Sequence, residues 1–247
     1  LGLDTNLMTA ARDTGLFAAH DISAEGLTLP IAWDDAEFLP FDWGYFAFVH
    51  NADLPNPPQS FEELAASDLR ILIQDPRSST PGLGLVYWIE AAYGDGAAQI
   101  WKDVADNIVT VTPGWSEAYG LFLEGEADMV LSYTTSPAYH LIAEEDPSKS
   151  AAAFDEGHYM QIEIAGITAA SDQPDLARAF MTFMLSPEFQ SVIPTTNWMY
   201  PAALPASALP DGFETLIAPE KVLHFSGDEA AALRDAAIDR WQTALSR

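Results

Sequence analysis

The sequence predicts an α/β fold in which helices cover a largely parallel sheet. Three short apolar runs, at residues 69–74, 108–111 and 129–131, have the composition of buried strands. Helix-capping signals or apolar residues at helical spacing lie between them. Strands that are apolar on both faces and separated by helices are typical of parallel sheets. A chain of 247 residues is long enough for one large core or two lobes.

The charge balance limits the classes of partner. The formal net charge is −27, from 37 acidic and 10 basic residues. This charge argues against nucleic acid and against an anionic membrane surface, and it favours the approach of a cation. The commoner interpretation of such a charge is a surface that serves solubility or salt adaptation.

The chain contains no cysteine, which excludes a disulfide framework, a thiolate zinc site and a cysteine nucleophile within these residues. The five histidines show no metal-ligand spacing, so no metal or cofactor is expected. The sequence contains no apolar run long enough to span a bilayer, and no membrane insertion is predicted.

The first residues, 1–4, resemble the end of a strand, which predicts that a further segment precedes them. Residues 6–14 are predicted to form a helix that ends at Gly15. Residues 41–49 are dense in aromatic and β-forming residues and predict a strand. Ser60 and Glu63 have the spacing of a capping box at the start of the next helix.

The loop after the strand at 69–74 reads DPRSSTPG. Thr80 is predicted to be an N-cap and Pro81 the first helical residue, in a helix that ends at Gly94. Free backbone N–H groups at such a helix start attract phosphate or carboxylate, although a simply capped helix is the commoner use of the pattern. A second helix is predicted over residues 97–106.

The segment from Gly114 to Tyr139 is the most informative part of the chain. Ser116 is predicted to cap a helix that ends at Gly125, and the next strand ends in Ser132 and Tyr133. Ligands of such sheets bind beyond the carboxyl ends of the strands. A pocket is therefore expected to contain Trp115, Ser132, Tyr133 and Tyr139. Aromatic and hydroxyl groups without an evident nucleophile or base indicate binding rather than catalysis.

The last third of the chain predicts a strand over 159–167 and two helical segments in 172–190, divided at Ser186. A capping box at Ser226 and Glu229 opens the last helix. The expected core faces are Leu176, Ala179, Phe180 and Phe183 in the first of these helices, and Leu233, Ala237, Trp241 and Leu245 in the last.

Six motifs resemble a known family. They are PFDWGYFAFV, NPPQSFEEL, QDPRSSTPGLGL, TPGWSEAYGLFLEGEADMVLSYTTSPAYH, FDEGHYMQIE and IPTTNWMYP. Together they are similar to the thiamine-binding proteins of thiamine ABC importers, over essentially the whole chain. The resemblance implies the two-lobe fold of type II periplasmic solute-binding proteins. Residues 1–46 and 166–247 would then form an N-terminally incomplete first lobe, and residues 47–165 the second.

The resemblance also implies a function. It indicates a monomeric periplasmic protein, not an enzyme, that captures thiamine or its phosphates between the lobes and delivers the ligand to the permease of an ABC importer. Matching motif by motif, the ligand-binding residues would be Trp115, Tyr133, Tyr139 in SPAY, Trp198 in NWMYP, Ser79 near a phosphate and Asp4 near the cleft. Aromatic faces suit the cation and flat rings of thiamine.

The sequence departs from the family at its start. The family has about two further strand–helix units ahead of the GLD strand, which supply an acidic residue and an aromatic residue to the cleft. We expect this chain alone to bind thiamine far less tightly, by calorimetry, than a version extended upstream.

Other functions remain open at this level. Ferric iron is disfavoured because iron-binding relatives use adjacent tyrosines, whereas Tyr133 and Tyr139 are six residues apart. A polyamine, held by aromatic groups and carboxylates, is excluded less sharply. A thiaminase-like enzyme would need a cysteine, and a serine hydrolase would need a G-x-S-x-G elbow, which the sequence lacks.

Overall fold

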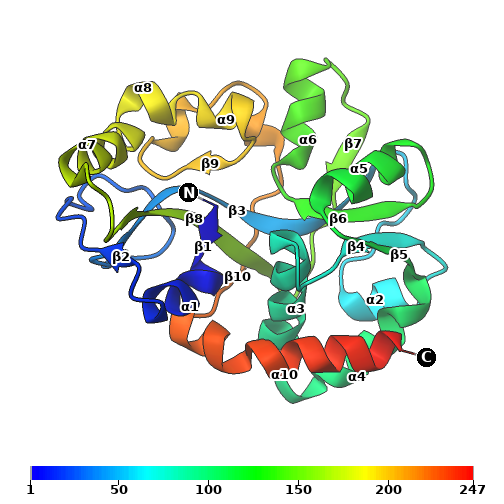
Figure 1. Cartoon of the computed structure of the whole chain (residues 1–247). Helices are drawn as coiled ribbons and strands as arrows, with labels where there is room; N and C mark the ends of the chain where they lie inside the picture. The colour runs from blue at the N-terminus through cyan, green and yellow to red at the C-terminus, as the bar shows by residue number, and fades with distance from the viewer. Residues whose placement is uncertain (1, 247) are drawn as a thin grey trace.

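The computed structural model describes residues 2–246, in which ten strands form one sheet with helices around it (Figure 1). The strands are β1 (Leu3–Asp4), β2 (Phe17–Ala18), β3 (Phe38–Asn51), β4 (Ile71–Gln74), β5 (Ile108–Thr112), β6 (Met129–Tyr133), β7 (Lys149–Ala151), β8 (His158–Thr168), β9 (Tyr200–Pro201) and β10 (Val222–Leu223).

The main path of the sheet runs in the order β1-β8-β3-β6-β4-β5. β4 pairs in parallel with both β5 and β6, which confirms the parallel arrangement predicted there. The two long strands differ, because β3 runs antiparallel to β6 on one side and to β8 on the other. The short strands β2 and β10 pair with β8, and β7 and β9 pair with β3.

The helices flank this sheet in groups (Figure 1). They are α1 (Met8–Asp13), α2 (Phe61–Ala65), α3 (Thr80–Tyr93), α4 (Ala97–Val104), α5 (Trp115–Leu123), α6 (Ser136–Ala138), α7 (Pro174–Met184), α8 (Pro187–Gln190), α9 (Ile193–Thr196) and α10 (Gly227–Leu245). A π-helical turn, η4 (Tyr139–Ala143), continues α6. In Figure 1, α7, α8 and α9 lie together on the side opposite α5, and α10 runs beneath α3.

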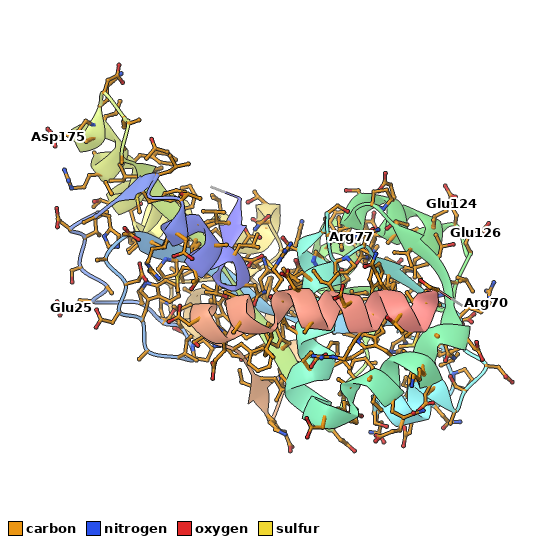
Figure 2. All side chains as sticks on the ribbon, turned by 60° about the horizontal axis from the view of Figure 1, so that its bottom comes forward. Glu25, Arg70, Arg77, Glu124, Glu126 and Asp175 are labelled. Atoms are coloured by element: carbon orange, nitrogen blue, oxygen red, sulfur yellow. The ribbon has the colours of Figure 1, made fainter. Side chains whose placement is uncertain are left out.

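The largest core cluster lies between α3, α4, α10 and the sheet. Trp88 and Trp101 are fully buried there, and Trp241 brings α10 into the same cluster. α10 therefore packs on helices from the stretch expected to form the second lobe. The Arg77 guanidinium lies 5.6 Å from the Trp241 ring centroid, which links the β4–α3 loop to α10. Figure 2 labels Arg77 next to α10.

Several predicted helix boundaries are confirmed. Gly94 and Gly125 follow helices with positive φ, at 52° and 84°. Ser226 and Glu229 form the predicted capping box. Ser60 caps α2, but the Glu63 carboxylate accepts from the N–H of Gln59 rather than from that of Ser60.

Two predicted caps are wrong by one or two residues. The N-cap of α3 is Ser79, not Thr80, because the Thr80 hydroxyl bonds to the carboxyl group of Asp4. The N-cap of α5 is Gly114, not Ser116, since the Glu117 carboxylate accepts from the Gly114 N–H at 3.0 Å. In neither helix does a hydroxyl of the N-cap residue cap the first turn.

The core face predicted for α7 is also wrong. Leu176, Phe180 and Phe183 are 63%, 46% and 49% exposed, and Ala179 is exposed as well. Met181 and Met184 are buried instead, against residues of β3 and β8. α7 carries two apolar stripes, and helical periodicity does not decide which of them faces the sheet.

The acidic turn after α5 is a solvated surface. Glu124 and Glu126 are exposed and project from one edge of the molecule near Arg70 (Figure 2). Arg70 pairs with Asp128 at 3.3 Å and donates to the carbonyl oxygen of Glu126. Within residues 2–246, no helix has the length and apolar character needed to cross a membrane.

A pair of glycine substitutions tests how closely α3 packs on β3. A Cβ on Gly84 would lie 2.0 Å from the Phe46 ring, whereas a Cβ on Gly120 in α5 would meet nothing within 4 Å. Gly84→Ala should lower the free energy of unfolding by about 2 kcal/mol or more, because the buried ring must shift. Gly120→Ala should raise it by about 0.5–1 kcal/mol through helix propensity. Urea denaturation followed by circular dichroism measures both, and equal effects would contradict the packing described.

Candidate functional site

Aromatic side chains from distant parts of the chain surround a cavity of about 560 Å³. Its walls include Trp115 and Tyr119 from α5, Tyr133 from the end of β6, Tyr139 from η4 and Trp198 from the loop after α9. Four of the six predicted site residues therefore meet at one cavity, beyond the carboxyl end of β6. This is the place where ligands of such sheets bind.

Hydrogen bonds and stacking hold Trp115 in the cavity wall. Its indole N–H donates to the Ser132 Oγ at 2.8 Å, and Ser132 Oγ lies 2.6 Å from Ser136 Oγ. Its ring stacks on Tyr119 with a centroid distance of 4.9 Å. The side chain nevertheless stays 38% exposed, so its ring remains available to a ligand.

Another part of the cavity wall consists of Tyr139 and Trp198. Their rings meet edge to face, with centroids 5.3 Å apart and planes at 82°. Trp198 has a left-handed backbone, φ 58°, and its N–H donates to the carbonyl oxygen of Ile193 at 3.0 Å. A bulky residue is uncommon in this conformation, and such strain is found preferentially at functional sites.

Tyr133 lies deeper in the cavity. Its ring is 5.1 Å from that of Phe46 by centroids. Burial raises the pKa of its hydroxyl well above the ordinary value, and the nearby carboxyl groups of Glu163, Asp4 and Asp42 raise it further. The hydroxyl is therefore neutral and can donate or accept a hydrogen bond.

Tyr119 is supported from behind by a chain of hydrogen bonds. Its hydroxyl lies 2.9 Å from His140 Nε2, and His140 Nδ1 lies 2.7 Å from Glu144 Oε2. His140, Glu144 and Asp146 have possible metal-ligating atoms within 4.8 Å of one another. Both ring nitrogens of His140 already have protein partners, so the described contacts assign this group to positioning Tyr119.

Ser79 and Asp4 do not line the cavity. Ser79 caps α3, whose Pro81 is a cavity residue. Asp4 is almost fully buried and accepts a hydrogen bond from the Asn6 N–H at 2.8 Å. Burial raises the pKa of the Asp4 carboxyl to about 6.

Sequence reasoning missed several residues of the cavity, among them Tyr119, Glu163, Asn197 and Met199. Tyr119 lies one helical turn after Trp115, so its spacing offered a signal. Glu163 is in the strand predicted over 159–167, and only the register with neighbouring strands places it at the cavity. The lining thus combines four predicted aromatic residues with apolar and polar residues that the sequence analysis did not identify.

The comparisons with known proteins agree on one family. Residues 43–195 match the family model described as bacterial extracellular solute-binding protein. The chain is 56% identical over 250 residues to the thiamine-binding periplasmic protein of Escherichia coli strain K12, spanning all of this chain and 76% of that protein.

Solved structures show the same relationship. A periplasmic thiamin binding protein superposes with a TM-score of 0.96 at 54% identity, over all of this chain and 78% of that one. A ferric binding protein from Campylobacter jejuni superposes with a TM-score of 0.80 over 98% and 81% of the two chains. Its identity is only 20%, so this second likeness concerns the fold alone.

The buried carboxyl of Asp4 gives a prediction for the pH dependence of stability. Its pKa rises from 3.8 to about 6 on folding. A raised carboxyl pKa favours folding below the unfolded pKa, and this contribution is lost as the pH rises through about 6. Asp4→Asn should therefore raise the free energy of unfolding near pH 7.5 by ~1–3 kcal/mol.

This gain should shrink toward zero near pH 4, because the wild-type carboxyl is then protonated in the fold. Urea denaturation at the two pH values measures the difference. A gain that is the same at both values would mean that ionisation of Asp4 is not its cause.

Proposed function

Since the chain belongs to the family of thiamine-binding periplasmic proteins, among the bacterial extracellular solute-binding proteins, we propose that it captures thiamine or a thiamine phosphate in the aromatic cavity. Like the other members of this family, the chain is a periplasmic binding protein and not an enzyme. In this proposal it hands the ligand, as a monomer, to the permease of an ABC importer.

The convergence of Trp115, Tyr133, Tyr139 and Trp198 on one cavity is the observation that carries the proposal. Thiamine is a cation with two flat rings. Each aromatic face that meets the cation contributes roughly 0.5–2 kcal/mol, and ring stacking adds about 0.5–1.5 kcal/mol. The acidic surface raises the local concentration of a cationic ligand.

The division into lobes is part of the same proposal. Trp198 comes from the segment 166–247, assigned with 1–46 to the first lobe. Trp115, Tyr133 and Tyr139 come from 47–165, assigned to the second. An interlobe site would explain why both segments contribute rings to one cavity. Ser79, next to the cavity's α3 wall, is proposed to face a phosphate tail.

A polyamine is the second candidate ligand. The carboxyl groups of Glu163, Asp42 and Asp4 lie close to the cavity, and Glu163 lines it. A flexible polycation could use these groups together with the aromatic walls. This feature favours a polyamine over an uncharged solute.

A thermal-shift comparison separates the candidates. We expect thiamine and thiamine diphosphate to raise the melting temperature, because a ligand that binds only the folded state stabilises it. Spermidine and ferric citrate should leave it unchanged. Stabilisation by spermidine alone would replace the proposed ligand with a polyamine.

Trp115→Ala tests the site itself. Loss of one stacking face should weaken thiamine binding about 10-fold or more, equivalent to ~1.4 kcal/mol. Phe180→Ala is the matched control, because Phe180 is an exposed aromatic residue on α7 that lines no part of the cavity. Calorimetric titration measures both variants, and wild-type affinity in Trp115→Ala would refute the assignment.

A further inference from the structure

Three carboxylates form a row across the sheet beneath the aromatic cavity. Asp4 on β1 is directly opposite Glu163 on β8, and Asp42 on β3 is directly opposite the same Glu163. Side chains of directly opposed residues project from the same face of a sheet, about 5 Å apart. Like charges in this position repel one another, so the row opposes folding unless something compensates it.

The surroundings of the row supply only neutral hydrogen-bond donors. Asn197 Nδ2 donates to Asp42 Oδ2 at 2.6 Å, and Gln161 Nε2 lies 3.3 Å from Glu163 Oε1. Among the ion pairs within residues 2–246, none involves a member of the row. Asp42 Oδ1 is buried and has no partner at all. Buried carboxylates are normally paired, and these lack a cation.

A buried amide next to the row is a second observation that points to a ligand. Gln161 is 1% exposed, and its carboxamide bonds to both Glu163 and the Tyr133 hydroxyl. Its Oε1 is nevertheless buried without a partner. Glu163 itself lines the cavity, so the row reaches the cavity through this residue.

We propose that Glu163, backed by Asp4 and Asp42, is the counter-charge by which the aromatic cavity selects a permanently cationic ligand over a neutral one of the same shape. This inference rests on the proposed function and assigns a specificity role to residues outside the aromatic wall. The aromatic faces would contact both ligands equally, and the carboxylate row would add an attraction for the charged ligand alone.

Burial favours the protonated forms of the carboxyl groups in the row, and a bound cation would favour their ionised forms. Burial raises the pKa of Asp4, and burial together with the Glu163 charge raises the pKa of Asp42. The titratable groups that face the row are the hydroxyls of Tyr133 from β6, Tyr87 from α3 and Tyr159 from β8. All three are neutral at physiological pH, so a bound cation is the group that favours full ionisation of the row.

The test compares thiamine with its neutral thiophene isostere, in which carbon replaces the quaternary nitrogen. Wild-type protein should bind thiamine at least 10-fold more tightly than the isostere. Glu163→Gln should bring this ratio close to one while changing the affinity for the isostere less than about 3-fold. Asp42→Asn, farther from the cavity, should lower the ratio in part.

Glu126→Gln is the matched control, because it removes one exposed negative charge from a residue that does not line the cavity and should keep the wild-type ratio. The wild-type ratio should also fall as the pH is lowered from about 8 to 6, as protonation removes the counter-charge. Both ligands carry the same aminopyrimidine, so its own titration cancels in the ratio.

The outcomes are distinguishable. A ratio that Glu163→Gln leaves at the wild-type value, with binding of both ligands retained, overturns this inference and leaves the proposed function standing. Failure of the unmodified protein to bind thiamine overturns the proposed function and this inference with it. Circular dichroism and the affinity for the isostere show whether each variant is folded.

Discussion

The antiparallel pairing of β3 with β8 is the constraint on which the rest of the structure depends. These long strands lie next to each other in the sheet, and the shorter strands β1, β2, β6, β7, β9 and β10 attach to one or the other. Their register sets Asp42 opposite Glu163 and Tyr45 opposite Met160. A slip by one residue would turn every side chain of the shifted strand to the other face and would break the alignment of Asp42 with Glu163.

The cavity has two parts with different roles: a wall of aromatic side chains, and a floor formed by the carboxylate row of Asp4, Asp42 and Glu163. Trp115 is hydrogen-bonded to Ser132 and Tyr119 to His140, so protein contacts position both rings. A wall that is already ordered loses less side-chain entropy when something binds. The floor differs, because its carboxyl groups have neutral donors and unfilled acceptor sites. Shape thus comes from the wall and charge preference from the floor.

The sequence was sufficient for many of the elements and for four aromatic residues of the cavity wall. Gly94, Gly125 and the Ser226 capping box depend on local backbone chemistry, which local sequence encodes. The aromatic residues at strand ends followed from the general position of ligands in such sheets. The division of 1–46 and 166–247 from 47–165, and the ligand roles of the six site residues, stay predictions.

What the sequence could not provide depended on long-range contacts. The cap of α3 moved because Asp4, from another strand, takes the Thr80 hydroxyl. α7 carries two apolar stripes, and packing against the sheet determines which of them is buried. The carboxylate row exists only in the register of three strands, since its members are 38 and 121 positions apart along the chain.

The 2.6 Å contact between the Asn197 amide and the Asp42 carboxylate joins the floor of the cavity to the loop that carries Trp198. It also restricts the order in which changes at these two positions can accumulate. The substitution Asn197→Asp would place a fourth carboxyl group against that of Asp42. The substitution Asp42→Asn would instead leave two side-chain amides, which can still hydrogen-bond to each other. Exchange of the pair through the two-amide intermediate therefore avoids this repulsion.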